Sequence, residues 1–182
     1  MLYRNAAGAC ETQSMKRRTL FKLGAASAAL LAVGGGAAAL LQPGLHDGKL
    51  AAAGREVFRA VGRAVLQASL PPEEAARQAA LDGLLERIDA LALALPPHAQ
   101  DELSQLLSLL ASVPGRHLLA GLNRPWPVAS EADIQQALQG MRLSTLALRQ
   151  QAYAALHDIA AAAYFTDEAT WPQLGYPGPL AI

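Results

Sequence analysis

The residues best suited to acid–base or metal chemistry are four histidines, and they are scattered along the chain. They are His46, His98, His117 and His157. None has a second histidine, a cysteine or a paired carboxylate at a spacing typical of a metal site, such as His-Glu-x-x-His. Unpaired histidines are most often structural or solvated. The sequence therefore predicts neither a catalytic histidine nor a metal centre.

The other reactive residue types are equally sparse. Cys10 is the single cysteine, so residues 11–182 can form no disulfide, no Cys-ligated iron–sulfur cluster and no covalent haem attachment. Adjacent carboxylates at 73–74 and 101–102 fall where helices are expected to begin, and there they complement the helix dipole. No serine lies in a Gly-x-Ser-x-Gly motif. We expect no catalytic residue and no cofactor-binding residue in this chain.

Charge separates the chain into two parts. Residues 1–43 hold five basic residues and one acid, whereas residues 44–182 hold ten basic and fourteen acidic residues. Binding to nucleic acid depends on neutralising phosphates with lysine and arginine. The mildly acidic body therefore argues against a nucleic-acid partner and leaves protein partners open.

Residues 15–41 carry paired arginines, Arg17 and Arg18, close to their start. They continue as a weakly apolar run that carries no charge after Lys22. The first part resembles the twin-arginine export signal Ser/Thr-Arg-Arg-x-Phe-Leu-Lys, although Lys16 replaces the Ser/Thr and the Phe-Leu pair is inverted. The predicted signal residues are Arg17, Arg18, Leu20, Phe21 and Lys22. Such signals are addresses read by a receptor, and the pathway exports folded proteins. We therefore expect residues 1–41 to be a twin-arginine signal region and the protein to be periplasmic.

A membrane anchor is the main alternative for this segment, because about 20 apolar residues can span a bilayer. In that case the protein would stay at the inner membrane through its signal helix alone. If the segment is removed, cleavage after Ala39 of Ala37-Ala38-Ala39 fits the pattern of small residues, and the same tract offers several other cleavage positions. Residues 1–14 precede Met15, and we interpret them as an upstream start artefact or as an extended N-terminal part of the signal.

The remainder of the chain has the composition of a helical protein. Hydrophobic residues make up 52%, and alanine and leucine, which favour helices, dominate over aromatic residues, which favour strands. Residues 42–48 contain proline and glycine and are predicted to be a linker. Residues 49–182 are predicted to form an all-α, compact bundle of about five or six helices with an irregular Trp/Pro/Gly-rich C-terminal tail.

Apolar stripes and helix-stop signals locate the individual helices. The clearest stripe is Leu81, Leu84, Leu85, Ile88, Leu91 and Leu95. Proline pairs at 71–72 and 96–97 delimit this helix, and the first helix is expected to start near Lys49. A short helix is predicted over about 114–121. Ser130 and Asp133 resemble a capping box, and Gly140 is expected to separate the helix that follows from a long last helix.

Both tryptophans lie in proline-bearing segments, RPWP and TWPQLGYPGP, and the other aromatic candidates gather in the C-terminal segment. Such residues either clamp a tail onto a bundle or bind a partner, since tryptophan and tyrosine are enriched at interface hot spots. The candidates for a partner interface are Trp126, Tyr164, Phe165, Trp171, Tyr176 and Pro177.

Three segments of the body carry a resemblance to a known family. They are LPPHAQDELSQLLSLLASVPGRHLLAGLNRPWP, LQGMRLSTLALRQQAYAALHDIAAAAYF and TWPQLGYPGP, and the last is the most specific. Together they cover most of residues 50–179. With the signal, they resemble the gluconate 2-dehydrogenase subunit 3-like family, the small twin-arginine-exported subunit of membrane-associated dehydrogenases.

The resemblance implies a non-catalytic subunit that supports the folding, stability and export of a partner dehydrogenase of the glucose–methanol–choline type. FAD would then be bound by the partner, electrons would pass to a cytochrome c subunit or another acceptor, and the twin-arginine translocase would be a further partner. Two alternatives stay open. One is a stand-alone periplasmic ligand-binding protein or enzyme with a pocket in the bundle, and the other is a membrane-anchored structural subunit.

Overall fold

The computed structural model describes residues 42–178, and these form an all-α bundle, as predicted. The chain enters through a two-residue hairpin, β1 (Leu45–His46) and β2 (Lys49–Leu50). The main helices are α2 (Ala52–Val65), α3 (Glu74–Ala94), α4 (Pro97–Ala111), α6 (Glu131–Arg142) and α7 (Ala147–Phe165). The shorter helical segments are α5 (Val113–Gly115), the π-helix η2 (Arg116–Ala120), and the 3-10 helices η3 (Trp126–Val128) and η4 (Glu168–Leu174).

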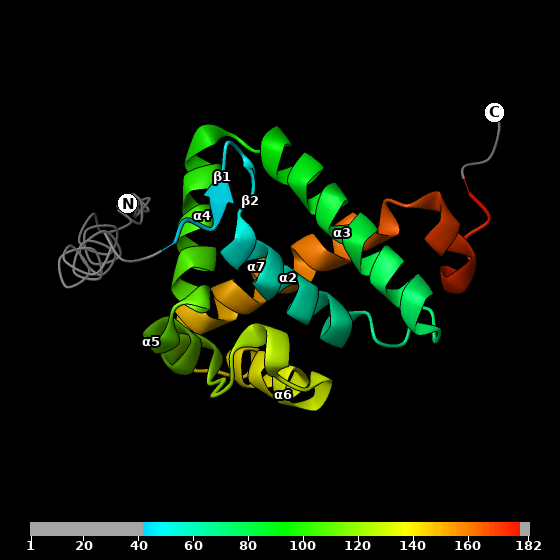
Figure 1. Cartoon of the computed structure of the whole chain (residues 1–182). Helices are drawn as coiled ribbons and strands as arrows, with labels where there is room; N and C mark the ends of the chain where they lie inside the picture. Colours follow the sequence, from blue (N-terminus) through cyan, green and yellow to red (C-terminus); the bar gives the residue numbers. More distant parts are fainter. Residues whose placement is uncertain (1–41, 179–182) are drawn as a thin grey trace, which may run out of the picture. The chain divides into compact units, whose positions relative to one another are not determined.

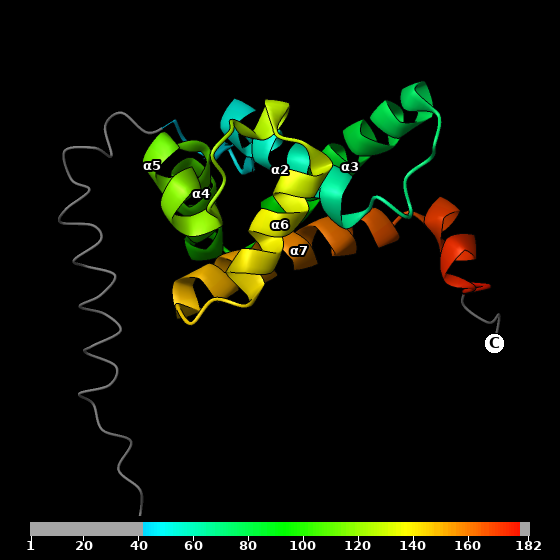
Figure 2. The same cartoon turned by 90° about the horizontal axis from the view of Figure 1, so that it is seen from below.

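Helix α2 lies at the centre of the bundle and contacts α3, α4, α6 and α7. In Figure 1, α3 and α4 rise on either side of α2 and α7 crosses behind it. Figure 2 shows α6 packed along α7, whose C-terminal end carries the last segment of the chain away from α4 and α5. Fully enclosed side chains from these helices form one core; the largest are Phe58, Leu81, Leu84, Leu85, Ile88, Leu107, Leu110, Trp126, Ile134, Met141 and Leu156.

Prolines and side-chain caps set the helix ends, as the sequence indicates. The carboxylate of Glu73 accepts the main-chain N–H of Ala76 at 2.9 Å, so α3 begins directly after the first proline pair. Pro97 opens α4. Ser130 and Asp133 form the predicted capping box at the start of α6, with each side chain accepting the other's main-chain N–H.

Two predicted helix boundaries were wrong. Gly140 does not break its helix, since α6 continues to Arg142 and the chain turns at Leu143–Leu146 instead. Ser144 favours that turn, because its hydroxyl accepts the N–H of Leu146 at 3.2 Å and so competes with helical bonding. The first helix starts at Ala52 rather than near Lys49, because Lys49 belongs to the hairpin.

The entry hairpin turns at Asp47-Gly48, and both residues have positive φ, 49° and 73°. This is the sequence and backbone preferred in two-residue hairpins. Asp89 of α3 holds the second strand, because its Oδ1 accepts the main-chain N–H of Leu50 at 2.7 Å. The predicted linker is therefore folded onto the bundle from Gly44 onward, where the carbonyl accepts the N–H of Ala51 at 3.0 Å.

The segment predicted as a short helix over 114–121 is helical, but it is α5 followed by a π-helix that ends at Gly121 with φ of 69°. Single π-helical turns are frequent at functional sites.

None of the helices between residues 42 and 178 combines the length and hydropathy needed to cross a membrane. The predicted signal residues, and the signal helix itself, lie outside the described residues.

Candidate functional site

Two of the six predicted interface residues are core residues of this chain. Trp126 is 2% exposed, and its indole Nε1 donates to the main-chain oxygen of Leu110 at 2.8 Å. Tyr164 is 3% exposed, and its hydroxyl donates to the main-chain oxygen of Ser69 at 2.7 Å. Their polar atoms are satisfied within the bundle, as buried tyrosine and tryptophan require. Neither side chain is presented at the surface, so the expectation that they contact a partner is corrected.

The other four residues lie at the C-terminal end of the bundle, in or beside residues 166–178, here called the C-terminal hook. Trp171 donates its indole N–H to the main-chain oxygen of Phe165 at 3.0 Å. Its ring meets that of Tyr176 edge to face, with centroids 5.2 Å apart. Gly175 between them has φ of 68°, a backbone conformation that glycine adopts without strain. The chain thereby reverses and sets Tyr176 beside Trp171.

The hook is bound to α3 through Arg87. The Nε of Arg87 donates to the main-chain oxygen of Ala163 at 2.7 Å, and its Nη1 lies 3.1 Å from Oδ2 of Asp167. The other oxygen of Asp167 caps the first turn of η4 by accepting the N–H of Ala169 at 3.0 Å. One guanidinium therefore fixes both the end of α7 and the start of the hook.

An open recess of about 650 Å³ lies on the hook, lined by the Trp171 ring, Tyr176 and Pro177 together with Glu168. Tyr176 is 48% exposed. Aromatic and proline surfaces of this kind bind apolar and aromatic groups of a second molecule at little cost in side-chain entropy. The arrangement suits recognition of a second molecule.

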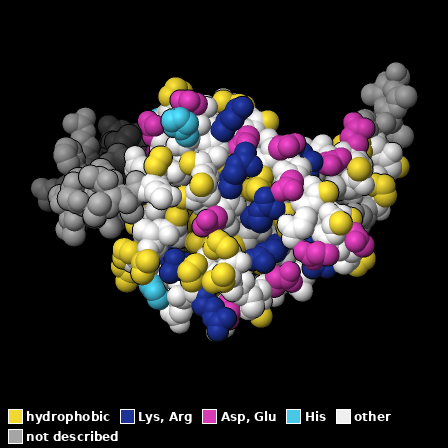
Figure 3. Space-filling view, in the orientation of Figure 1, with side chains coloured by type: hydrophobic (Ala, Val, Ile, Leu, Met, Phe, Trp, Pro, Cys, Tyr) yellow, Lys and Arg dark blue, Asp and Glu magenta, His cyan; other side chains and the backbone are white. Residues whose placement is uncertain are grey.

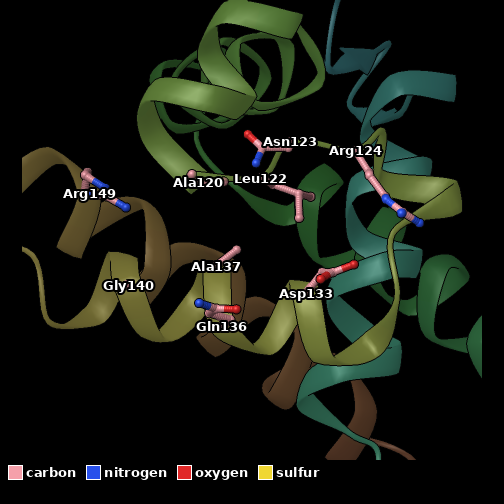
Figure 4. Close-up of a pocket in the computed structure, with 10 residues that line it drawn as sticks. Ala120, Leu122, Asn123, Arg124, Asp133, Gln136, Ala137, Gly140 and Arg149 are labelled. Atoms are coloured by element: carbon pink, nitrogen blue, oxygen red, sulfur yellow. The ribbon is translucent and has the colours of Figure 1, made fainter.

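A second pocket, which the sequence did not predict, lies between α6, the start of α7 and the segment after η2. Its volume is about 420 Å³. Figure 4 shows Arg149 extending from α7 toward the gap between α6 and residues 120–124, with Gln136 on the α6 side. Arg124 and Asp133 lie at the opposite end. This pocket, here called the Arg149 pocket, gathers polar groups that are far apart in the sequence.

The histidines are not brought together. His46 lies 3.4 Å from Asp47 and His157 3.0 Å from Asp158, both pairs at the surface, and the Nδ1 of His117 lies 3.1 Å from Oδ1 of Asn123. Over residues 42–178, no three His, Cys, Asp or Glu side chains are grouped as a metal site would need.

Basic side chains form a row across one face of the molecule, with acidic side chains beside many of them (Figure 3). On α2 the pairing is direct: Arg55 is bonded to Asp89, and Arg59 lies 2.5 Å from Asp82. These carboxylates neutralise the two arginines, so the row differs from the uncompensated patches that bind nucleic-acid phosphates.

Comparisons of this chain with protein-family models, with curated proteins and with solved structures find no match.

Proposed function

We propose that this chain is a non-catalytic small subunit that supports the folding, stability and twin-arginine export of a flavin-dependent dehydrogenase of the glucose–methanol–choline type. The proposal starts from the resemblance described above and from the paired arginines Arg17 and Arg18. FAD belongs to the partner in this scheme, and the site of action is the periplasm.

The C-terminal hook is the observation that carries the proposal. Its aromatic pair is held in place by bonds within the chain, through Arg87 and the Phe165 carbonyl, while Tyr176 remains 48% exposed. A surface that is fixed before binding loses little conformational entropy when a partner covers it. The hook is therefore the surface assigned to the dehydrogenase subunit, with Trp171, Tyr176 and Pro177 as contact residues and Phe165 supporting them.

The export step is tested by co-purification from the periplasm. The chain carries a C-terminal tag and is expressed with its genomic neighbours, as wild type and as Arg17→Lys/Arg18→Lys. The proposal expects a flavoprotein to co-elute with the wild type from the periplasm and to remain cytoplasmic with the double variant. Export of the chain alone, as a monomer without a flavin-bearing companion, would overturn it.

The interface is tested in the same co-purification with surface variants. Tyr176→Ala and Pro177→Ala should each lower the yield of co-eluting flavoprotein without lowering the melting temperature of the isolated chain. Leu118→Ala is the control, because Leu118 is more exposed, at 76%, but lies in η2 rather than on the hook. Equal losses with Leu118→Ala would show that the hook is not the contact surface.

The Arg149 pocket favours a second candidate, a stand-alone periplasmic ligand-binding protein. Small-molecule sites commonly have volumes of roughly 300–1,000 Å³, and this pocket has about 420 Å³. That candidate predicts export without a companion in the co-purification above.

A further inference from the structure

We propose that the Arg149 pocket binds a small polar oxyanion, a carboxylate or a phosphate, on the guanidinium of Arg149. The inference does not depend on the proposed subunit function, because it concerns residues remote from the hook and a ligand other than the partner protein.

The guanidinium of Arg149 is fixed at one edge and available at the other. Its Nε donates to the main-chain oxygen of Leu119 at 2.7 Å, which anchors the side chain to the end of η2. Within residues 42–178, its two Nη atoms form no hydrogen bond or ion pair with another residue. A planar guanidinium held in this way presents paired N–H groups, the geometry that binds carboxylate and phosphate through two parallel hydrogen bonds.

Two glycines lie beside that edge of the guanidinium. A Cβ atom built at Gly121 or at Gly140 would lie 3.7 Å from Nη2 of Arg149, in ordinary contact with it. Gly121 has φ of 69°, so the backbone conformation alone explains why a glycine occupies this position. Gly140 lies within α6 without a positive φ, where alanine is the better helix former. Alanine would therefore fit at position 140 in both backbone and space, and its absence leaves the volume beside Nη2 to a ligand.

The other polar groups of the pocket suit an anion with further hydrogen-bonding atoms. The amides of Asn123 and Gln136 line it and can each donate and accept. Asp133 is the one acidic residue of the lining, and its Oδ2 already accepts the main-chain N–H of Ser130 at 3.3 Å in the capping box. With Arg124 at the far end, the lining has two arginines against this single aspartate, a balance that favours a negatively charged ligand.

The test is a titration of the purified full chain with inorganic phosphate and, separately, with succinate, followed by calorimetry and by the shift in melting temperature at constant ionic strength. A ligand that binds only the native state raises the melting temperature as its concentration exceeds the dissociation constant. The proposal expects at least one probe to bind with a dissociation constant of about 1 mM or tighter. Binding of phosphate alone or of succinate alone identifies the class, and binding of neither overturns the proposal.

Two matched variants distinguish anion binding in the Arg149 pocket from general electrostatic attraction of anions to the protein. Arg149→Gln and Arg142→Gln each remove one positive charge, but Arg142 is exposed and bonded to Gln139 outside the pocket lining. Loss of a charged hydrogen-bond pair should weaken binding at Arg149→Gln by about tenfold or more. Arg142→Gln should change it little, and equal weakening by both variants would overturn the proposal.

A second pair of variants keeps the test decisive if Arg149→Gln does not fold. Gly140→Ala should raise the melting temperature because alanine favours the helix, yet weaken anion binding because its methyl group takes up space beside Nη2 that the ligand would use. Gly83→Ala is the control: it also places a methyl group beside an arginine within a helix, but Arg87 is already bonded to Ala163 and Asp167. Unchanged anion binding by Gly140→Ala would contradict the assigned geometry.

Discussion

Replacing Asp89 by alanine should destabilise the fold far more than replacing Asp82, although both aspartates lie on α3 and both pair with an arginine of α2. Asp89 is 8% exposed, and it bonds both Arg55 and the main-chain N–H of Leu50. Asp82 bonds Arg59 at 2.5 Å, with side-chain exposures of 38% for the arginine and 60% for the aspartate. The two sites differ mainly in burial and in the extra main-chain bond.

The expected loss in free energy of unfolding follows from the polar groups that each substitution leaves without a partner. Removing Asp89 strands the N–H of Leu50, a residue that is 5% exposed, and an orphaned buried donor costs about 1–3 kcal/mol. The Arg55 side chain is 41% exposed, so water replaces part of the bond that it loses. Loss of the Arg55–Asp89 ion pair therefore adds about 1 kcal/mol to the cost of the substitution. The expected loss is therefore about 3 kcal/mol for Asp89→Ala, against about 0–1 kcal/mol for the exposed pair in Asp82→Ala.

Urea unfolding followed by far-UV circular dichroism measures both free energies of unfolding. The slope with denaturant should stay unchanged in each variant, so that the midpoint reports stability alone. The variant Arg55→Met, combined with Asp89→Ala, completes a double-mutant cycle that isolates the Arg55–Asp89 term. Losses within about 0.5 kcal/mol of each other for Asp89→Ala and Asp82→Ala would refute the burial argument, since that is the error expected for independent sites.

Three further substitutions test other contacts. Trp126→Phe should lower the free energy of unfolding by about 1–3 kcal/mol, because a main-chain carbonyl of α4 loses its donor, and chemical denaturation measures it. Gly44→Ala should cost about 1–3 kcal/mol, because its Cβ would lie 2.4 Å from Cβ of Leu107; a thermal melt unchanged from wild type would contradict this. Arg87→Gln should speed amide hydrogen exchange in residues 167–178 while the α2 amides exchange as before, since the bonds lost are those to the end of α7 and to the hook.

The fold was predictable because leucine spacing and proline pairs act locally. Leu81, Leu84, Leu85 and Ile88 are fully buried on one face of α3, as their spacing predicts. The stripe is interrupted at Leu91, which is 36% exposed, whereas Leu95 beyond it is partly buried against the core. Helical periodicity gives the direction of a side chain, but whether another helix covers that direction depends on tertiary packing.

The candidate functional surfaces, the aromatic residues and the Arg149 pocket, could be predicted only in part from the sequence. Trp126 stands between two prolines, which indicates a loop, and loop residues are usually at the surface. Here the one-turn helix η3 packs against α2 and buries the indole. The Arg149 pocket combines three segments, so no local spacing contains it. Its one signal was Gly140, a glycine that the helical pattern does not explain and that was interpreted as a helix break.

If the chain is exported as proposed, the enclosure of Gly44 sets a geometric limit on where a signal peptidase can cut it. A Cβ at Gly44 would lie 2.5 Å from the main-chain oxygen of Ser104, so the folded body begins at this residue. The predicted cleavage point, after Ala39, is five residues upstream. Even fully extended, five residues reach about 18 Å at most. A peptidase that cut after Ala39 would therefore have to work within this distance of the folded bundle, close to the α4 residues Ser104 and Leu107 that enclose Gly44.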